Sequence, residues 1–320
     1  TIQLKAQGVA TAEGLQQATT LGPVAALARH ASGSTPYALA LSFRQGLPEI
    51  QVQTNLQGLA LALPAPLGKR AEAVQPLRFE TQVLRPAQTD GPPRDQLTLD
   101  LPGLGSAVYQ REHPPGEDHA QVLRGALALG LKAGEESPLP AQGVRANLQL
   151  AQLDADAWSA LLASPVASAA SGQRASLGQL SAQDYLPTTV ALRVGALTVQ
   201  GRTLNQVVAG GSREQGLWRA NFDTQESSGY VEYRPAETNR GAGRLYARLA
   251  RLHLPPSEVS EVEALLDERP GSLPALDIVV DDFELRGRAL GRLEIEAYHR
   301  GKEGPLREWQ LAKLNLAVPE

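Results

Sequence analysis

The chain has 320 residues, of which 42% are hydrophobic and 20% are charged, and its formal net charge is −4. This composition is typical of a folded chain, and it excludes a disordered segment or a strongly basic nucleic-acid-binding surface. Cysteine is absent, so disulfides, thiol catalysis and cysteine metal sites are excluded as well.

Nothing in the sequence predicts a membrane-spanning segment. No stretch approaches the roughly 20 consecutive apolar residues that a membrane helix requires, and no charged-then-apolar leader opens the chain. The chain starts at Thr1, contains no methionine and stops at Glu320 directly after a strand-like run. We therefore expect a segment of a longer protein, with any anchor or signal outside it.

Apolar and polar residues alternate along most of the first half of the chain. This period of two predicts half-buried strands, and the turn-rich stretches 86–94 and 113–118 between them favour antiparallel pairing. The alternating apolar positions are Leu39, Leu41, Phe43, Ile50, Val52, Leu59, Leu61, Leu77, Phe79, Leu97, Leu99, Leu127 and Leu129.

Three segments have helical spacing instead, near residues 21–31, 154–163 and 257–267. Asp154 is a plausible N-cap for the second helix, and the third follows Pro255 and Pro256. Both of these helices are candidate lids on a sheet. Their apolar positions are Trp158, Leu161, Leu162, Val262 and Leu265.

An Ala/Ser/Gly-rich stretch at 166–180 predicts a flexible loop. We place the division of the chain there, between an N-terminal part, 1–165, and a C-terminal part, 181–320.

The C-terminal part contains an internal repeat. A shift of 86 residues superimposes Val190 on Leu276 and continues without gaps through Gly201 on Gly287. The two copies, about 190–222 and 276–311, each predict a meander of strand, glycine turn, strand, loop and strand. Such repeats stack side by side and bury a continuous face. Their apolar positions are Leu192, Val194, Leu197, Val199, Ile278, Val280, Phe283, Leu285, Leu293, Ile295 and Leu311.

No catalytic motif is present. The sequence lacks phosphate loops, dinucleotide fingerprints, nucleophile elbows and S-x-x-K pairs. His113 and His119 flank an exposed proline turn without a third histidine nearby. The acidic pair Asp281 and Asp282 is replaced by Gly195-Ala196 in the other repeat copy. We therefore predict no enzyme, no metal site and no cofactor.

Trp158, Trp218 and Trp309 could stack a sugar or a base, but indoles on amphipathic elements more often fill core or groove space. The interpretation that we favour is packing.

Two stretches resemble the YhdP branch of the AsmA-like envelope proteins. They are residues 55–69 (NLQGLALALPAPLGK) and residues 276–288 (LDIVVDDFELRGR) with their continuation to Leu316, and the likeness includes the helix start at 153–158 (LDADAW). The likeness extends over most of the chain, and it consists of strand and turn patterns, with no reactive residues among them.

The resemblance implies a mostly β fold, with a long, twisted, largely antiparallel sheet curled into an open groove and a few short helices. It also implies a periplasmic piece of an inner-membrane-anchored protein of a Gram-negative bacterium that carries phospholipid toward the outer membrane. Both membranes would then be contacted through parts of the protein outside this chain.

Two functional hypotheses remain open. In the first, the alternating apolar residues line a groove for phospholipid acyl chains, because a single curled sheet would otherwise expose too much apolar surface. In the second, the chain is a structural envelope scaffold with a closed core and no lipid cargo. No nucleic acid is expected as a partner in either case.

Overall fold

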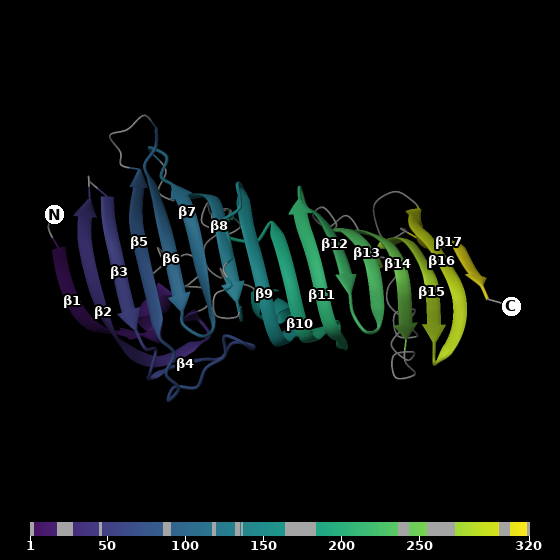
Figure 1. Ribbon diagram of the computed structural model, residues 1–320, viewed down its shortest axis with the longest axis horizontal. Helices are drawn as coiled ribbons and strands as arrows, with labels where there is room; N and C mark the ends of the chain where they lie inside the picture. The colour runs from purple at the N-terminus through teal and green to yellow at the C-terminus, as the bar shows by residue number, and fades with distance from the viewer. Residues whose placement is uncertain are drawn as a thin grey trace. The chain divides into compact units, whose positions relative to one another are not determined.

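The computed structural model describes residues 3–17, 28–44, 47–85, 91–116, 120–131, 135, 137–163, 184–235, 243–254, 273–300 and 308–318. Within these ranges the chain forms seventeen strands and two short helices (Figure 1). Strands make up 69% of the structure and their pairing is mostly antiparallel in an open, unclosed sheet. The predicted fold class is therefore confirmed.

The chain divides into two units, Thr1–Thr189 with Thr198–Arg202, and Val190–Leu197 with Thr203–Glu320. The first unit contains two helices, α1 (Ala12–Gln17) and α3 (Ala155–Ala163). Its strands are β1 (Gln3–Thr11), β2 (Ala31–Arg44), β3 (Leu47–Thr54), β4 (Leu59–Leu61), β5 (Leu77–Arg85), β6 (Arg94–Leu101), β7 (Gly105–Glu112), β8 (Gln121–Leu129) and β9 (Gly143–Asp154).

Neighbouring strands of the first unit pair in nearly sequential order. β1 pairs with β2, β2 with β3, β3 with β5, and β5 to β8 follow one another, all antiparallel. The short β4 pairs with the beginning of β2, where Ala31 lies opposite Leu61. β8 and β9 are parallel, so the chain has to cross over between them.

The second unit contains most of β10 (Thr189–Val199) and seven further strands. These are β11 (Arg202–Glu214), β12 (Leu217–Asp223), β13 (Ser227–Arg234), β14 (Arg244–Leu254), β15 (Ala275–Leu285), β16 (Arg288–Arg300) and β17 (Glu308–Ala317). From β11 to β17 each strand pairs with the next. The pairing is antiparallel except between β14 and β15, which are parallel.

The strands of the two repeat copies have the same bounds after the shift of 86 residues. β10 corresponds to β15 and β11 to β16, residue for residue at both ends. Each pair is joined by two residues with positive φ, Gln200 (52°) and Gly201 (74°) in one copy and Arg286 (54°) and Gly287 (72°) in the other. Two consecutive residues with positive φ are what a tight hairpin turn requires, and glycine adopts that conformation without strain.

Helix α3 lies where the sequence indicates a helix near 154–163. Asp154 caps it, because its Oδ1 accepts the Ala157 N–H at 2.8 Å. Helix α1 was not predicted; it follows Thr11, whose Oγ1 accepts the Gly14 N–H at 3.1 Å. The predicted helix near 257–267 and the predicted loop at 166–180 lie outside the described residues, as does most of the predicted helix near 21–31.

The Asp156 carboxylate of α3 holds the hairpin turn between β10 and β11. Its Oδ1 accepts the Gln200 N–H at 2.6 Å, and its Oδ2 accepts the Gly201 N–H at 2.7 Å. Hydrogen bonds to a charged acceptor contribute more stability than neutral ones. We expect Asp156→Ala to lower the free energy of unfolding by about 1–2 kcal/mol, measured by denaturant unfolding.

Amide hydrogen exchange gives a local check on the same variant. The Gln200 and Gly201 amides should lose protection in Asp156→Ala, whereas the Arg286 amide of the matching turn, which donates to Leu254 O at 2.9 Å, should not. Equal protection of Gln200 and Gly201 in both proteins would contradict the assigned role.

Candidate functional site

One face of the first unit's sheet is apolar, and the strand register defines it. Residues directly opposite each other on paired strands point to the same side of a sheet. In the central row across this sheet, each residue is the cross-strand partner of the next. The row consists of Ala6, Leu39, Val52, Phe79, Leu99, Ala107, Leu127 and Ala146. We call this side the apolar face of the first unit.

The two neighbouring rows have the same character. One includes Leu4, Leu41, Ile50, Leu97 and Tyr109, and the other Tyr37, Leu77, Leu101 and Leu129. Of the residues singled out from the sequence, this face therefore contains Leu39, Leu41, Phe43, Ile50, Val52, Leu77, Phe79, Leu97, Leu99, Leu127 and Leu129. Leu59 and Leu61 lie apart on β4, where Leu59 is buried.

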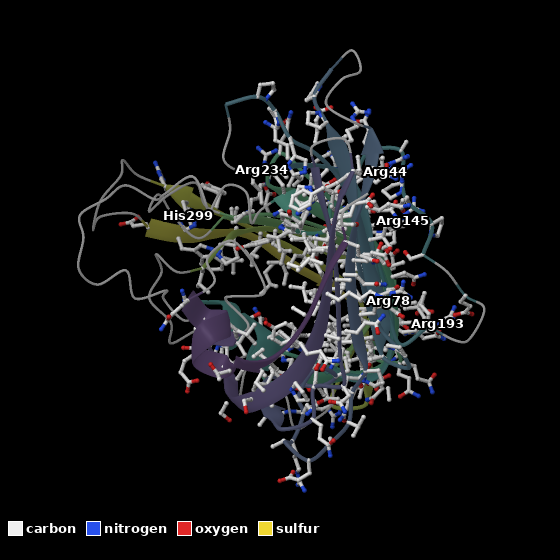
Figure 2. The ribbon with its side chains drawn as sticks, turned by 90° about the vertical axis from the view of Figure 1, so that its left-hand side faces the viewer. Arg44, Arg78, Arg145, Arg193, Arg234 and His299 are labelled. Atoms are coloured by element: carbon white, nitrogen blue, oxygen red, sulfur yellow. The ribbon has the colours of Figure 1, made fainter. Side chains whose placement is uncertain are left out.

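The opposite side of the same sheet is polar. Gln96, Gln110 and Arg124 lie opposite one another on β6, β7 and β8. Gln110 Nε2 donates to Gln96 Oε1 at 3.1 Å, and Arg124 Nε donates to Gln110 Oε1 at 2.8 Å. Figure 2 shows the side chains of Arg44 and Arg78 directed to one side of the sheet. Arg44 and Arg78 form ion pairs with Glu49 and Glu80.

Part of the apolar face is covered by Tyr185, which packs onto Tyr109 of β7. Tyr109 and Val144 are buried in one cluster with Ala107, and the ring of Tyr185 packs edge-on against Tyr109 with centroids 5.0 Å apart. The Tyr109 hydroxyl donates to Tyr185 O at 3.1 Å. Burial raises the pKa of Tyr109, so this phenol stays neutral and is no candidate for general-base chemistry.

Two charged residues lie on the same side of the sheet, in the row next to Leu97 and Tyr109. Asp95 and Arg111 are cross-strand partners and form a two-pronged ion pair, with oxygen to nitrogen distances of 2.9 and 2.6 Å. His113 Nε2 lies 3.1 Å from Asp95 Oδ2. Burial would raise the pKa of Asp95, but hydrogen bonds from His113 and Arg111 and the charge of Arg111 outweigh it and lower this pKa. The charges compensate each other, which favours a structural role.

The second unit also has one apolar face. Its central row, again taken from cross-strand partners, consists of Ala209, Phe222, Gly229, Leu249, Val280, Leu293 and Leu316. A β-bulge between Val280 and Phe283 returns Phe283 to this face. Of the residues singled out from the sequence, the face contains Ile278, Val280, Phe283, Leu285, Leu293, Ile295 and Leu311.

In the other repeat copy, Leu192 and Val194 alternate with exposed residues of β10, and Val194 is buried. Leu197 and Val199, which follow on the same strand, are half-buried.

Ion pairs cover the opposite side of the second unit's sheet. Arg248 pairs with Asp277 at 2.8 Å and Arg251 with Asp223 at 3.3 Å. Arg292 lies 3.3 Å from Asp281. Further pairs join His253 to Asp282 and Lys313 to Glu294. Asp281 and Asp282 therefore belong to a solvated charge network, as expected from their absence in the other repeat copy.

The apolar face of the second unit is unevenly covered. Val280 is fully buried and Phe283 is 8% exposed. By contrast, Leu314 on β17 is 64% exposed, and Leu311 and Leu316 are exposed too. These three leucines lie on the same face, because their partners on β16 are Ile295, Ala297 and Leu293. Exposed aliphatic side chains that are contiguous along one strand indicate a surface for an apolar ligand or partner.

The tryptophans have different environments. Trp158 Nε1 donates to Ala65 O at 3.1 Å, and Trp309 Nε1 donates to Pro274 O at 2.9 Å. Trp218 is exposed at the edge of the apolar face. Of the other candidate lid residues, Leu161 is half-buried on α3, whereas the Leu162 side chain, Val262 and Leu265 lie outside the described part of the structure.

Several buried residues with smaller side chains were not identified from the sequence as part of the apolar faces. Ala107, Val144 and Ala146 in the first unit and Ala247 and Ala297 in the second are buried, and they lie in rows with the predicted leucines and valines. The period of two runs through them, so counting every alanine and valine in the pattern as apolar would have found them.

Neither a metal site nor a membrane-spanning helix is present in the part of the chain that the structure describes. No three His, Asp or Glu side chains there are arranged to hold an ion. No helix there combines the length and hydrophobicity needed to cross a bilayer.

Comparison with known proteins identifies the family. The family model described as YhdP protein matches residues 1–320, the full length of the chain. No curated protein and no solved structure matches. The full-length match agrees with the motifs at 55–69, 153–158 and 276–288 and with the open β-sheet. This chain belongs to the YhdP family.

Proposed function

We propose that this chain binds phospholipid acyl chains on its apolar sheet faces and helps to move phospholipid between the inner and outer membranes. It would do so in the periplasm, as part of a protein anchored in the inner membrane outside this chain. The YhdP family consists of envelope proteins related to lipid transport and is not known as an enzyme family.

The observation that supports this proposal is the division of each sheet into a mainly apolar and a mainly polar side. In the second unit, leucine, isoleucine, valine and phenylalanine occupy one side, while ion-paired arginines and acids occupy the other. A sheet made for water on both sides would not retain leucines as exposed as Leu314. Acyl chains would supply the missing apolar layer.

The energetics favour weak, movable binding. Each methylene that is removed from water contributes about 0.8 kcal/mol, so contact with a few methylenes holds an acyl chain. The rows contain mainly aliphatic side chains without hydrogen-bonding groups, so neighbouring positions have similar affinity. A lipid can then slide from row to row without a large barrier.

The test is lipid co-purification with a matched pair of variants on β17. Leu314 lies on the apolar face, and its neighbour Asn315 lies on the polar face opposite Glu294. Both are exposed, so an aspartate at either position leaves the fold intact. We expect Leu314→Asp to reduce co-purified phospholipid at least twofold, as expected for a carboxylate placed within an acyl-chain contact, and Asn315→Asp to leave the amount unchanged.

Phospholipid would be extracted with organic solvent and measured by mass spectrometry per mole of protein. A wild-type chain that is monodisperse and free of lipid would refute the lipid-binding proposal and support the scaffold with a closed core. Equal loss in both variants would show that the assignment of the lipid-binding face is wrong.

A further inference from the structure

Aromatic and arginine side chains from both sides of the second unit's sheet lie at the same strand ends, and together we call them the rim. Arg213, Trp218 and Tyr233 are successive cross-strand partners on the apolar face. Trp218 and Tyr233 are each 41% exposed. The Arg213 guanidinium lies over the indole of Trp218, 5.5 Å from the ring centroid. A guanidinium stacked in this way keeps its N–H groups free to donate in its plane.

Two further arginines lie at the same strand ends on the polar side. Arg234 follows Tyr233 on β13, and it lies directly opposite Arg244, the first residue of β14. Both are exposed, and among the described residues neither forms an ion pair. Like charges directly opposite each other destabilise a sheet. By contrast, Arg219 and Arg248 on the same side have acidic partners at 3.4 and 2.8 Å.

We propose that this rim, with Arg234 and Arg244 on the polar side and Arg213, Trp218 and Tyr233 on the apolar side of the same strand ends, binds the phosphate-bearing head group of an anionic phospholipid. This inference rests on the proposed function, because the acyl chains of the same lipid would lie on the apolar face of the second unit. An anionic head group would relieve the repulsion between Arg234 and Arg244. The chain as a whole has a net charge of −4, so the attraction has to come from this local cluster.

The chemistry of each rim residue fits its place. Arginine donates several N–H groups in a planar fork that matches the oxygens of a phosphate. Tryptophan and tyrosine prefer the boundary between apolar and polar surroundings, because their rings are apolar and their N–H and O–H groups are polar. The next row on the same face contains Ala220, Val231 and Ala247, which leads from the rim onto the apolar side chains.

The test compares head groups in one binding experiment. The purified chain is incubated with vesicles of equimolar phosphatidylglycerol and phosphatidylcholine, re-isolated, and its bound lipids are measured by mass spectrometry. We expect the wild type to be enriched in phosphatidylglycerol. We expect R234Q/R244Q to lower the bound ratio of phosphatidylglycerol to phosphatidylcholine by about fivefold or more. Each arginine attracts an anionic head group electrostatically, and the double variant removes two such charges.

The matched control is R286Q/R288Q, which makes the same change in net charge at the opposite strand ends. Both arginines are exposed beside the turn between β15 and β16. The control should keep the wild-type ratio, because interactions between exposed charges more than about 10 Å apart are largely screened in salt.

The outcomes separate this inference from the proposed function. A wild type that binds both lipids in the vesicle ratio, or a control that loses the preference as fully as R234Q/R244Q, would overturn the rim assignment and leave acyl binding intact. A chain that binds neither lipid would overturn both. If inorganic phosphate at the same phosphorus concentration abolished the preference, the rim would be a phosphate site and the lipid assignment would be wrong.

Discussion

Replacing Val280 with asparagine is expected to unfold the second unit or to lower its free energy of unfolding by about 3–4 kcal/mol. Val280 is fully buried at the centre of the apolar face, in a cluster with Phe283 and Leu293. An amide there would lose its hydrogen bonds to water without gaining partners among hydrocarbon side chains. Denaturant unfolding followed by circular dichroism measures the loss.

The matched control is Val208→Asn on β11. Val208 has the same side chain in the same type of strand, but it lies on the polar side opposite Asp223 and is 49% exposed. Its replacement should cost less than about 1 kcal/mol, the range of β-propensity differences. Val194, which matches Val280 in the repeat and is 1% exposed, should behave like Val280. Similar losses for Val208→Asn and Val280→Asn would show that the apolar face is not the core.

The second large effect is expected from Asp95→Ala in the first unit. The Asp95 and Arg111 side chains are only 12% and 16% exposed, so removal of the carboxylate leaves a largely buried guanidinium without its counter-charge. We expect a loss of about 2–4 kcal/mol in the free energy of unfolding, since these groups retain some contact with water. Glu80→Ala, at the exposed Arg78–Glu80 pair, should cost less than about 1 kcal/mol.

The pH dependence of stability gives an independent check on Asp95. Its pKa is lower in the folded state than in the unfolded state, so its contribution to stability is fully present above the unfolded pKa, about 3.9. That contribution is lost as the pH falls below about 4 and through the folded pKa. In Asp95→Asn the free energy of unfolding should therefore fall less steeply with acid than in the wild type. Parallel acid profiles would contradict the role of this ion pair.

The period-two pattern was enough to predict strands and the side chains that share a face. Leu97 and Leu99 lie on one side of β6, and Ile278 and Val280 lie on one side of β15. The 86-residue repeat likewise predicted the matching glycine turns at Gly201 and Gly287, because those turns depend on local backbone conformation.

Other features could not be predicted, because they depend on residues far apart in the chain. Asp95 and Arg111 look like ordinary surface charges until the register of β6 and β7 places them opposite each other. Helix α1 has only six residues, too few for a periodic pattern to be recognised. The arginines at the rim are likewise brought together by the pairing of β13 with β14.

By itself, the sequence determined the fold class, the repeat and the identity of the apolar residues, because period and turn chemistry are local properties of the chain. The tertiary structure decided that β8 pairs with β9 and β14 with β15 in parallel, and which apolar residues are covered. Val280 and Leu314 are both apolar residues on the same face, yet one is fully buried and the other is 64% exposed. Burial depends on the neighbours that folding places around a side chain, and alternation does not specify those neighbours.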